Sequence, residues 1–227
     1  MRMRAVVLVI LSLLIAPGYT QAEWQSLGPW KVTARTAHGV ELGSGAAWMR
    51  VLALSPSVVR LSYAPDGRFR SDIFAVLEKP GFTAPAIQIR EDAETVQVGT
   101  GAITVRVEKT TGRVAFVDEK GNIISEDAPH YPPAWNGSAF RVWKEMPLDE
   151  QYFGLGDKAG PTDHRNQAFT MWNTDAYGWN EGTDRLSAAV SWWSSCRVRA
   201  RPSRYARVYW SCVPMGGSSS GWKLRRQ

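Results

Sequence analysis

Short β-rich runs, each bounded by turn residues, constrain the fold of this chain more than any other feature. They recur at a spacing of roughly 8–12 residues and show no 3.6-residue apolar period. Several alternate between apolar and polar side chains, as half-buried strands do. The predicted strands are residues 30–34, 48–54, 58–63, 87–90, 95–98, 103–107, 114–117, 123–124 and 139–143. We therefore predict an all-β fold, a two-sheet antiparallel β-sandwich.

Turn residues indicate how these strands connect. Lys109–Gly112 predicts a hairpin between the two strands that flank it, and Ala37–Gly39 predicts an interruption after the first strand. Residues 126–137 predict a loop, because their three prolines cannot donate to the ladder of a central strand.

The first 22 residues have the pattern of a secretory signal peptide. A positively charged start precedes an apolar run from position 5 to 16, and Pro17–Gly18 ends it. This run is too short to cross a bilayer, and small residues follow it. We predict cleavage after Ala22, a secreted or periplasmic location, and no membrane span.

The formal charge of +6 is concentrated near the C-terminus. Residues 187–227 contain eight Lys or Arg and no Asp or Glu, which leaves a formal charge of −2 for residues 1–186. A nearly neutral body does not predict a nucleic-acid partner. The same segment holds nine serines, four tryptophans and both cysteines without periodicity, a composition that does not encode a packed element.

We interpret residues 187–227 as a basic tail that is disordered or translated out of frame after a frameshift near codon 185. The alternative is a genuine basic tail for an acidic partner or a membrane surface. Cys196 and Cys212 are able to pair in an exported chain, but in an out-of-frame tail their spacing carries no meaning.

Two motifs carry a resemblance to a known family. Phe-Gly-Leu-Gly-Asp-Lys at 153–158 is followed by Met-Trp-Asn-Thr-Asp-Ala-Tyr at 171–177. With the β-rich region before them, they resemble glycoside hydrolase family 31, the α-glucosidase family, over roughly residues 28–184. The resemblance implies that residues 23–186 form the galactose mutarotase-like N-terminal domain of such an enzyme.

Three glycines in and just after the first motif predict the local shape of this stretch. Gly154, Gly156 and Gly160 permit backbone conformations that are closed to other residues. We therefore expect this stretch to be a shaped turn and not a strand.

The resemblance implies that the second motif binds substrate. In the family this loop leans over the mouth of a (β/α)₈ barrel, and its carboxylate, here Asp175, contacts substrate hydroxyls. Trp172, Asn173 and Tyr177 are the other candidate substrate-binding residues, since sugars stack on aromatic faces and hydrogen-bond to short polar groups. The alternative is that the tryptophans belong to the core and that Asn173 and Asp175 cap a turn.

We expect no catalytic residue in this chain. A retaining glycosidase needs two carboxyls about 5–5.5 Å apart, and the resemblance places both on barrel strands, the nucleophile in a W-x-D-M-N-E-like motif that is absent here. A barrel takes about 250 residues, whereas 43 follow Asp184. We expect a chain that lacks the catalytic barrel and is inactive alone.

The remaining expectations concern ligands and partners. His38, His130 and His164 have no ligand partners at metal spacing, and no metal or cofactor is expected. The expected partners are an α-linked oligosaccharide or glycoside and the missing (β/α)₈ barrel of a full-length protein, not nucleic acid. The alternatives are a free-standing sugar-binding module and a basic-tailed binding protein.

Overall fold

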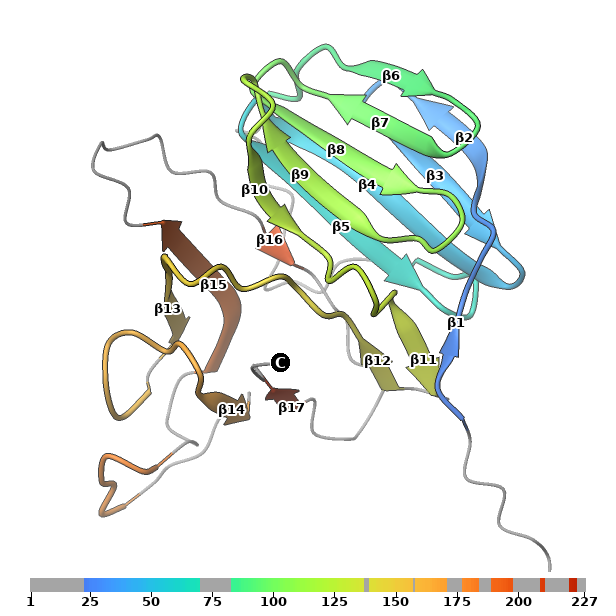
Figure 1. Cartoon of the computed structure of the whole chain (residues 1–227). Coiled ribbons are helices and arrows are strands. Elements are labelled where there is room, and N and C mark those ends of the chain that lie inside the picture. Colours follow the sequence, from blue (N-terminus) through green and yellow to red (C-terminus); the bar gives the residue numbers. More distant parts are fainter. Residues whose placement is uncertain are drawn as a thin grey trace, which may run out of the picture.

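The described residues of the chain form strands, turns and irregular segments. The computed structural model describes residues 23–69, 83–136, 139–156, 158–170, 177–183, 189–197, 209–210 and 221–223. Within these ranges no helix is long and apolar enough to cross a membrane. Two five-stranded sheets lie face to face (Figure 1), which confirms the predicted all-β sandwich.

The first sheet has the strand order β16-β5-β4-β3-β2. Its strands are β2 (Lys31–Thr36), β3 (Gly39–Ser44), β4 (Ala47–Ser55), β5 (Val58–Ala64) and β16 (Tyr209–Trp210). Neighbours from β2 to β5 pair antiparallel, whereas β16 pairs parallel to β5. The sequence did not predict β3, which follows directly on the predicted interruption.

The second sheet is antiparallel throughout and has the order β10-β9-β8-β7-β6. Its strands are β6 (Gln88–Glu91), β7 (Thr95–Gly99), β8 (Ile103–Glu108), β9 (Val114–Asp118) and β10 (Ile123–Glu126). The predicted hairpin between β8 and β9 is confirmed, because these two strands pair antiparallel across it.

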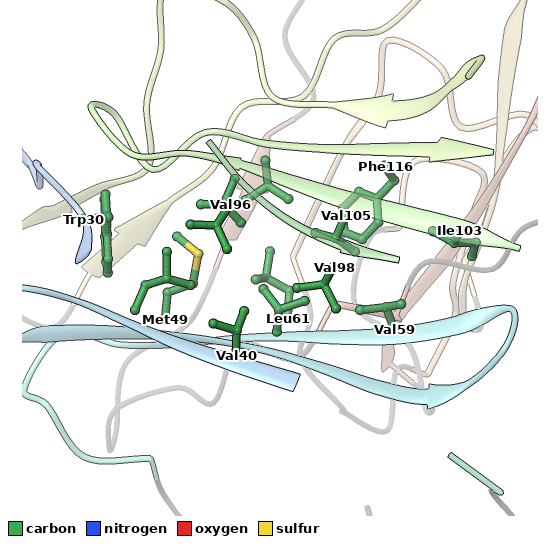
Figure 2. Close-up of a cluster of buried hydrophobic side chains, with 14 of the residues drawn as sticks. Trp30, Val40, Met49, Val59, Leu61, Val96, Val98, Ile103, Val105 and Phe116 are labelled. Carbon is green, nitrogen blue, oxygen red and sulfur yellow. The ribbon is translucent and has the colours of Figure 1, made fainter. Parts of the chain in front are cut away.

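The core lies between the two sheets. Buried and partly exposed side chains alternate along β4, β7 and β8, as expected for strands with one face against the core. Figure 2 shows side chains of the first sheet pointing at side chains of the second. Its labelled residues are Trp30, Val40, Met49, Val59, Leu61, Val96, Val98, Ile103, Val105 and Phe116.

Trp30 closes one end of this core and rests against the β8–β9 hairpin. Its backbone N–H donates to the Lys109 carbonyl at 2.6 Å, and its indole N–H donates to the Leu27 carbonyl at 3.0 Å. Gly112, at φ +73°, packs on the indole ring, and a Cβ built there would lie 2.2 Å from the indole nitrogen. The turn therefore requires glycine for both its backbone angle and its close approach.

A small sheet lies beside the sandwich in the order β1-β11-β12. It consists of β1 (Gln25–Ser26), β11 (Ala134–Asn136) and β12 (Ala139–Arg141). The prediction of an uninterrupted loop over 126–137 is wrong in its last residues, since β11 follows directly after the prolines. β12 covers the first part of the strand predicted at 139–143.

Four further strands form two ribbons outside the sandwich. They are β13 (Glu150–Gly156), β14 (Ala168–Thr170), β15 (Ala189–Arg197) and β17 (Gly221–Lys223), with β13 paired to β15 and β14 paired to β17. Three strands, β15 to β17, thus fall in the segment predicted to be a basic tail. That this segment is out of frame or disordered stays a prediction.

The expectation of a turn in place of a strand at the first motif is wrong. β13 runs through Gly154 and Gly156, and its register with β15 shifts between these two residues. Gly154 has φ +110°, so the glycine produces an irregularity inside a strand and does not end it. Gly160 lies beyond the strand, in the loop before β14.

Charged side chains link the edges of the two large sheets. Arg35 of edge strand β2 forms an ion pair with Glu91 of edge strand β6. Lys109 Nζ lies 2.6 Å from the other oxygen of the same carboxylate, and its hydrogen bond is the main cause that lowers the pKa of Glu91. The Glu91 carboxylate thus links edge strand β2 of the first sheet to the second sheet.

Candidate functional site

Of the four candidate substrate-binding residues, the structure describes one. Trp172, Asn173 and Asp175 lie outside the described residues. Tyr177 is described, and 96% of its surface is exposed. The segment that leads into the motif, residues 158–170, is described in full.

Arg165 joins this segment to the chain in front of β13. Its guanidinium donates to three backbone carbonyls, those of Met146 at 3.0 Å, Pro147 at 2.6 Å and Glu150 at 2.5 Å. Such a planar fork of donors fixes two stretches of chain in one relative position. The loop after β13 is therefore held to the turn before β13.

Asp163 closes the same loop from the other side. One carboxylate oxygen accepts the backbone N–H groups of Tyr152 and Arg165, both at 3.0 Å. The bond from the Tyr152 N–H is the main cause that lowers the pKa of Asp163, because it stabilises the charged form. Beneath it, the buried Tyr152 hydroxyl donates to the Glu150 carboxylate at 2.9 Å.

His164 and Phe169 form the apolar base of the loop. Both are buried, and their rings meet edge to face with centroids 4.6 Å apart. The backbone N–H of His164 donates to the Tyr152 carbonyl at 2.8 Å. Lys158 Nζ lies 5.5 Å from the centroid of the Phe169 ring. The buried Phe169 lies only two residues before the second motif begins.

The chain after the motif forms a tight turn over residues 177–183. The Asn180 N–H donates to the Thr183 hydroxyl at 2.9 Å, and the Asn180 side chain accepts the Gly182 N–H at 2.9 Å. Trp179 is 64% exposed. The turn therefore presents two aromatic side chains, Tyr177 and Trp179, to the surroundings on a hydrogen-bonded backbone.

A buried ion pair connects the approach to β13 with the sandwich. Lys144 pairs with Asp127, whose second oxygen accepts the Val114 N–H of β9 at 2.7 Å. Burial raises the pKa of Asp127 and lowers the pKa of Lys144, because both charges lie out of water. Removing one partner alone would leave the other charge buried and unpaired.

The Asp163 carboxylate holds the loop to β13, whereas the Glu150 carboxylate accepts the Tyr152 hydroxyl within β13. Sequence reasoning assigned no role to Asp163 and Arg165. The sequence shows a charged Asp-His-Arg run between the two motifs. Such a run alone does not reveal whether its side chains bond to the backbone or face solvent. Across the described ranges, no group of three or more His, Cys, Asp or Glu is placed to hold a metal ion.

Several known proteins are similar to this chain. Alpha-glucosidase 2 of Bacillus thermoamyloliquefaciens is 26% identical over 168 residues, which are 70% of this chain and 20% of that enzyme. A family 31 dextranase of Flavobacterium johnsoniae, solved with isomaltotriose, aligns at 24% identity with a TM-score of 0.68 over 75% of this chain and 21% of that chain.

A third similar protein is a family 31 alpha-xylosidase of Xanthomonas citri. It aligns at 22% identity with a TM-score of 0.57, over 72% of this chain and 18% of that chain. The chain thus spans about a fifth of the length of these relatives.

A family model matches residues 49–201 of the 227. The match includes most of the sandwich, both motifs and the loop held by Arg165. It also extends past residue 184, where the resemblance seen in the sequence ended. The chain belongs to the family described as the glycosyl hydrolase 31 N-terminal galactose mutarotase-like domain.

Proposed function

We propose that this chain is the N-terminal domain of an exported family 31 glycosidase, in which its 171–177 segment walls a sugar pocket that a (β/α)₈ barrel completes. One observation carries the proposal: the family match spans both motifs, and the loop between them is a hydrogen-bonded support that leaves Tyr177 exposed. The similar alpha-glucosidase and the dextranase solved with isomaltotriose support α-glucosides as the substrate class.

In this function Asp175 binds substrate hydroxyls, while Asn173 adds a directional hydrogen bond. Trp172 and Tyr177 supply flat apolar faces for the sugar ring. The nucleophile and the acid/base residue belong to the barrel, so the chain hydrolyses nothing alone. Its N-terminal 22 residues direct export and are removed, and residues 187–227 are read out of frame.

A direct assay tests the central claim. The purified chain should release no p-nitrophenol from p-nitrophenyl α-glucoside or α-xyloside above the rate in buffer, because the proposal assigns both reacting carboxyls to the barrel. Turnover by the chain alone, lost on inactivation by heat, would overturn the proposal.

The DNA sequence after codon 185 tests the proposed frameshift. We expect another reading frame to continue with family-like sequence and to restore an active glycosidase. In that restored protein, Asp175→Asn should lower kcat/KM about 10- to 100-fold, the loss of one charge-assisted hydrogen bond. The matched change Asp149→Asn, at an exposed turn residue, should leave kcat/KM within about twofold. A family-like sequence in neither frame would contradict the frameshift.

A further inference from the structure

The chain on both sides of the second motif meets the same loop. Residues 171–176 lie outside the described residues, but residues 158–170 before them and 177–183 after them are described. We call residues 158–170 the support loop. It leads directly into the motif, and it also touches the turn that follows the motif, through Gly160. Each end of the motif therefore has its own attachment.

Arg165 and Asn166 shape the end before the motif. The Arg165 guanidinium donates to three backbone carbonyls at 2.5–3.0 Å. Asn166, at φ +63°, lies in the left-handed region, which asparagine tolerates better than most side chains. It turns the chain directly after the arginine, and the Gln167 backbone N–H donates back to the His164 carbonyl at 3.2 Å. Strand β14 thus starts from a closed turn that Arg165 holds in place.

Gly160 contacts the end after the motif. It has φ +96°, and a Cβ built there would lie 3.3 Å from the Glu181 carbonyl oxygen. A side chain at this position would therefore press on the 177–183 turn and strain the backbone as well. The turn keeps its own shape, because the Thr183 N–H donates to the Asn180 carbonyl at 2.9 Å. The returning chain thus lies against a position that favours glycine.

We propose that the support loop positions the 171–177 segment from both ends, with Arg165 setting the end before it and Gly160 the end after it. The sugar-binding role of this segment rests on the proposed function, whereas the two attachments do not. A segment that is fixed at both ends has fewer conformations to lose when a ligand orders it than one fixed at a single end. Arg165 and Gly160 are therefore positioning residues that act without touching the sugar.

The two attachments are separable from the stability of the sandwich. None of residues 158–170, all of which the structure describes, belongs to the buried cluster between the two large sheets. Arg165 bonds to residues 146–150, and Gly160 touches residue 181. Loss of either attachment should therefore open the support loop or the following turn while the large sheets stay folded.

Amide hydrogen exchange of the full chain, resolved by NMR, tests the first attachment. Arg165→Lys keeps the charge but loses the planar fork of donors. Exchange of the Tyr152 and His164 N–H groups, which bond within the support loop and to it, should rise at least about tenfold. The N–H groups of β7 and β8 should keep their rates. Arg68→Lys, at an exposed residue after β5, is the matched control and should change neither set.

Gly160→Ala tests the second attachment by the same measurement. Exchange of the Thr183 N–H should rise at least about tenfold, while the Tyr152 N–H stays protected. Gly101→Ala is the matched control, because Gly101 has φ +95° and nothing lies within 4 Å of an added Cβ. It carries the same backbone strain without the contact and should leave the Thr183 N–H unchanged.

The motion of the motif's described end gives a direct readout of positioning. The ¹⁵N order parameters of the Tyr177 and Trp179 backbone N–H groups should fall in both Arg165→Lys and Gly160→Ala, and in neither control. Order parameters that stay unchanged in either variant overturn the proposal. Faster exchange throughout β7 and β8 overturns it as well, because the substitution would then act on global stability. Turnover of a glycoside by the chain alone would contradict the proposed function and leave these attachments intact.

Discussion

At the scale of single residues, Gly112 joins a turn to the core. Its φ of +73° is unfavourable for any side chain, and a Cβ would collide with the Trp30 indole. Gly112→Ala should therefore combine backbone strain with overpacking and destabilise the chain by about 2–4 kcal/mol. Urea unfolding followed by circular dichroism measures the loss.

Gly121 is the matched control for this change. It has φ +84°, but nothing lies within 4 Å of an added Cβ, so Gly121→Ala should cost only the backbone strain of about 1–2 kcal/mol. Equal losses in the two variants would show that the contact with Trp30 contributes nothing.

At the scale of elements, the loop between β13 and β14 depends on an ionised Asp163. Its folded pKa is lowered, so the carboxylate stabilises the fold above the ordinary value of about 3.9 and loses this effect as the pH falls through the folded pKa. Asp163→Asn retains an acceptor oxygen but cannot titrate. Its stability should therefore fall less steeply than that of the unchanged chain below about pH 4.

Urea unfolding at a series of pH values between about 2 and 6 tests this slope. Asp149→Asn serves as the control, because Asp149 is exposed in the neighbouring turn and should keep the slope of the unchanged chain. If the stability of Asp163→Asn falls with pH as steeply as that of the unchanged chain, the ionised Asp163 carboxylate does not stabilise the loop.

The same scale shows which elements could be predicted from sequence. Strands with clear alternation, such as β4, β7 and β8, were predicted within one or two residues. β3 was missed because glycines at positions 39 and 43 concealed a strand that pairs on both sides. β13 was missed because glycine suggests a turn locally, whereas pairing with β15 decides the backbone. The pairing of strands that lie far apart in the chain cannot be predicted from a short stretch of sequence.

The candidate site was predictable only as a segment. Two motifs in order located it, and the exposure of Tyr177 agrees with a surface role. The support beneath it was not predictable, because Arg165 donates to carbonyls 15 to 19 residues away. Hydrogen bonds to backbone carbonyls depend on the path of the backbone, and the accepting residues need no particular side chain.

At the scale of the whole molecule, the interface between the two large sheets determines stability. Leu61 is 1% exposed at its centre, so Leu61→Ala should cost about 2–5 kcal/mol through lost burial and the cavity it leaves. Leu148 is 84% exposed, and Leu148→Ala should stay within about 0.5 kcal/mol of the unchanged chain. Urea midpoints of the two variants give the comparison, and a small loss in Leu61→Ala would mean that the sheets do not pack as described.

The ion pairs that join Arg35, Glu91 and Lys109 have a consequence beyond one molecule. Strands β2 and β6 end their sheets on the same open side, where unpaired backbone groups invite a strand from a second chain. A neighbour that docked there would have to separate these charges and desolvate them. The same three side chains that link the two layers thus protect the β2 and β6 edges against pairing with a second chain.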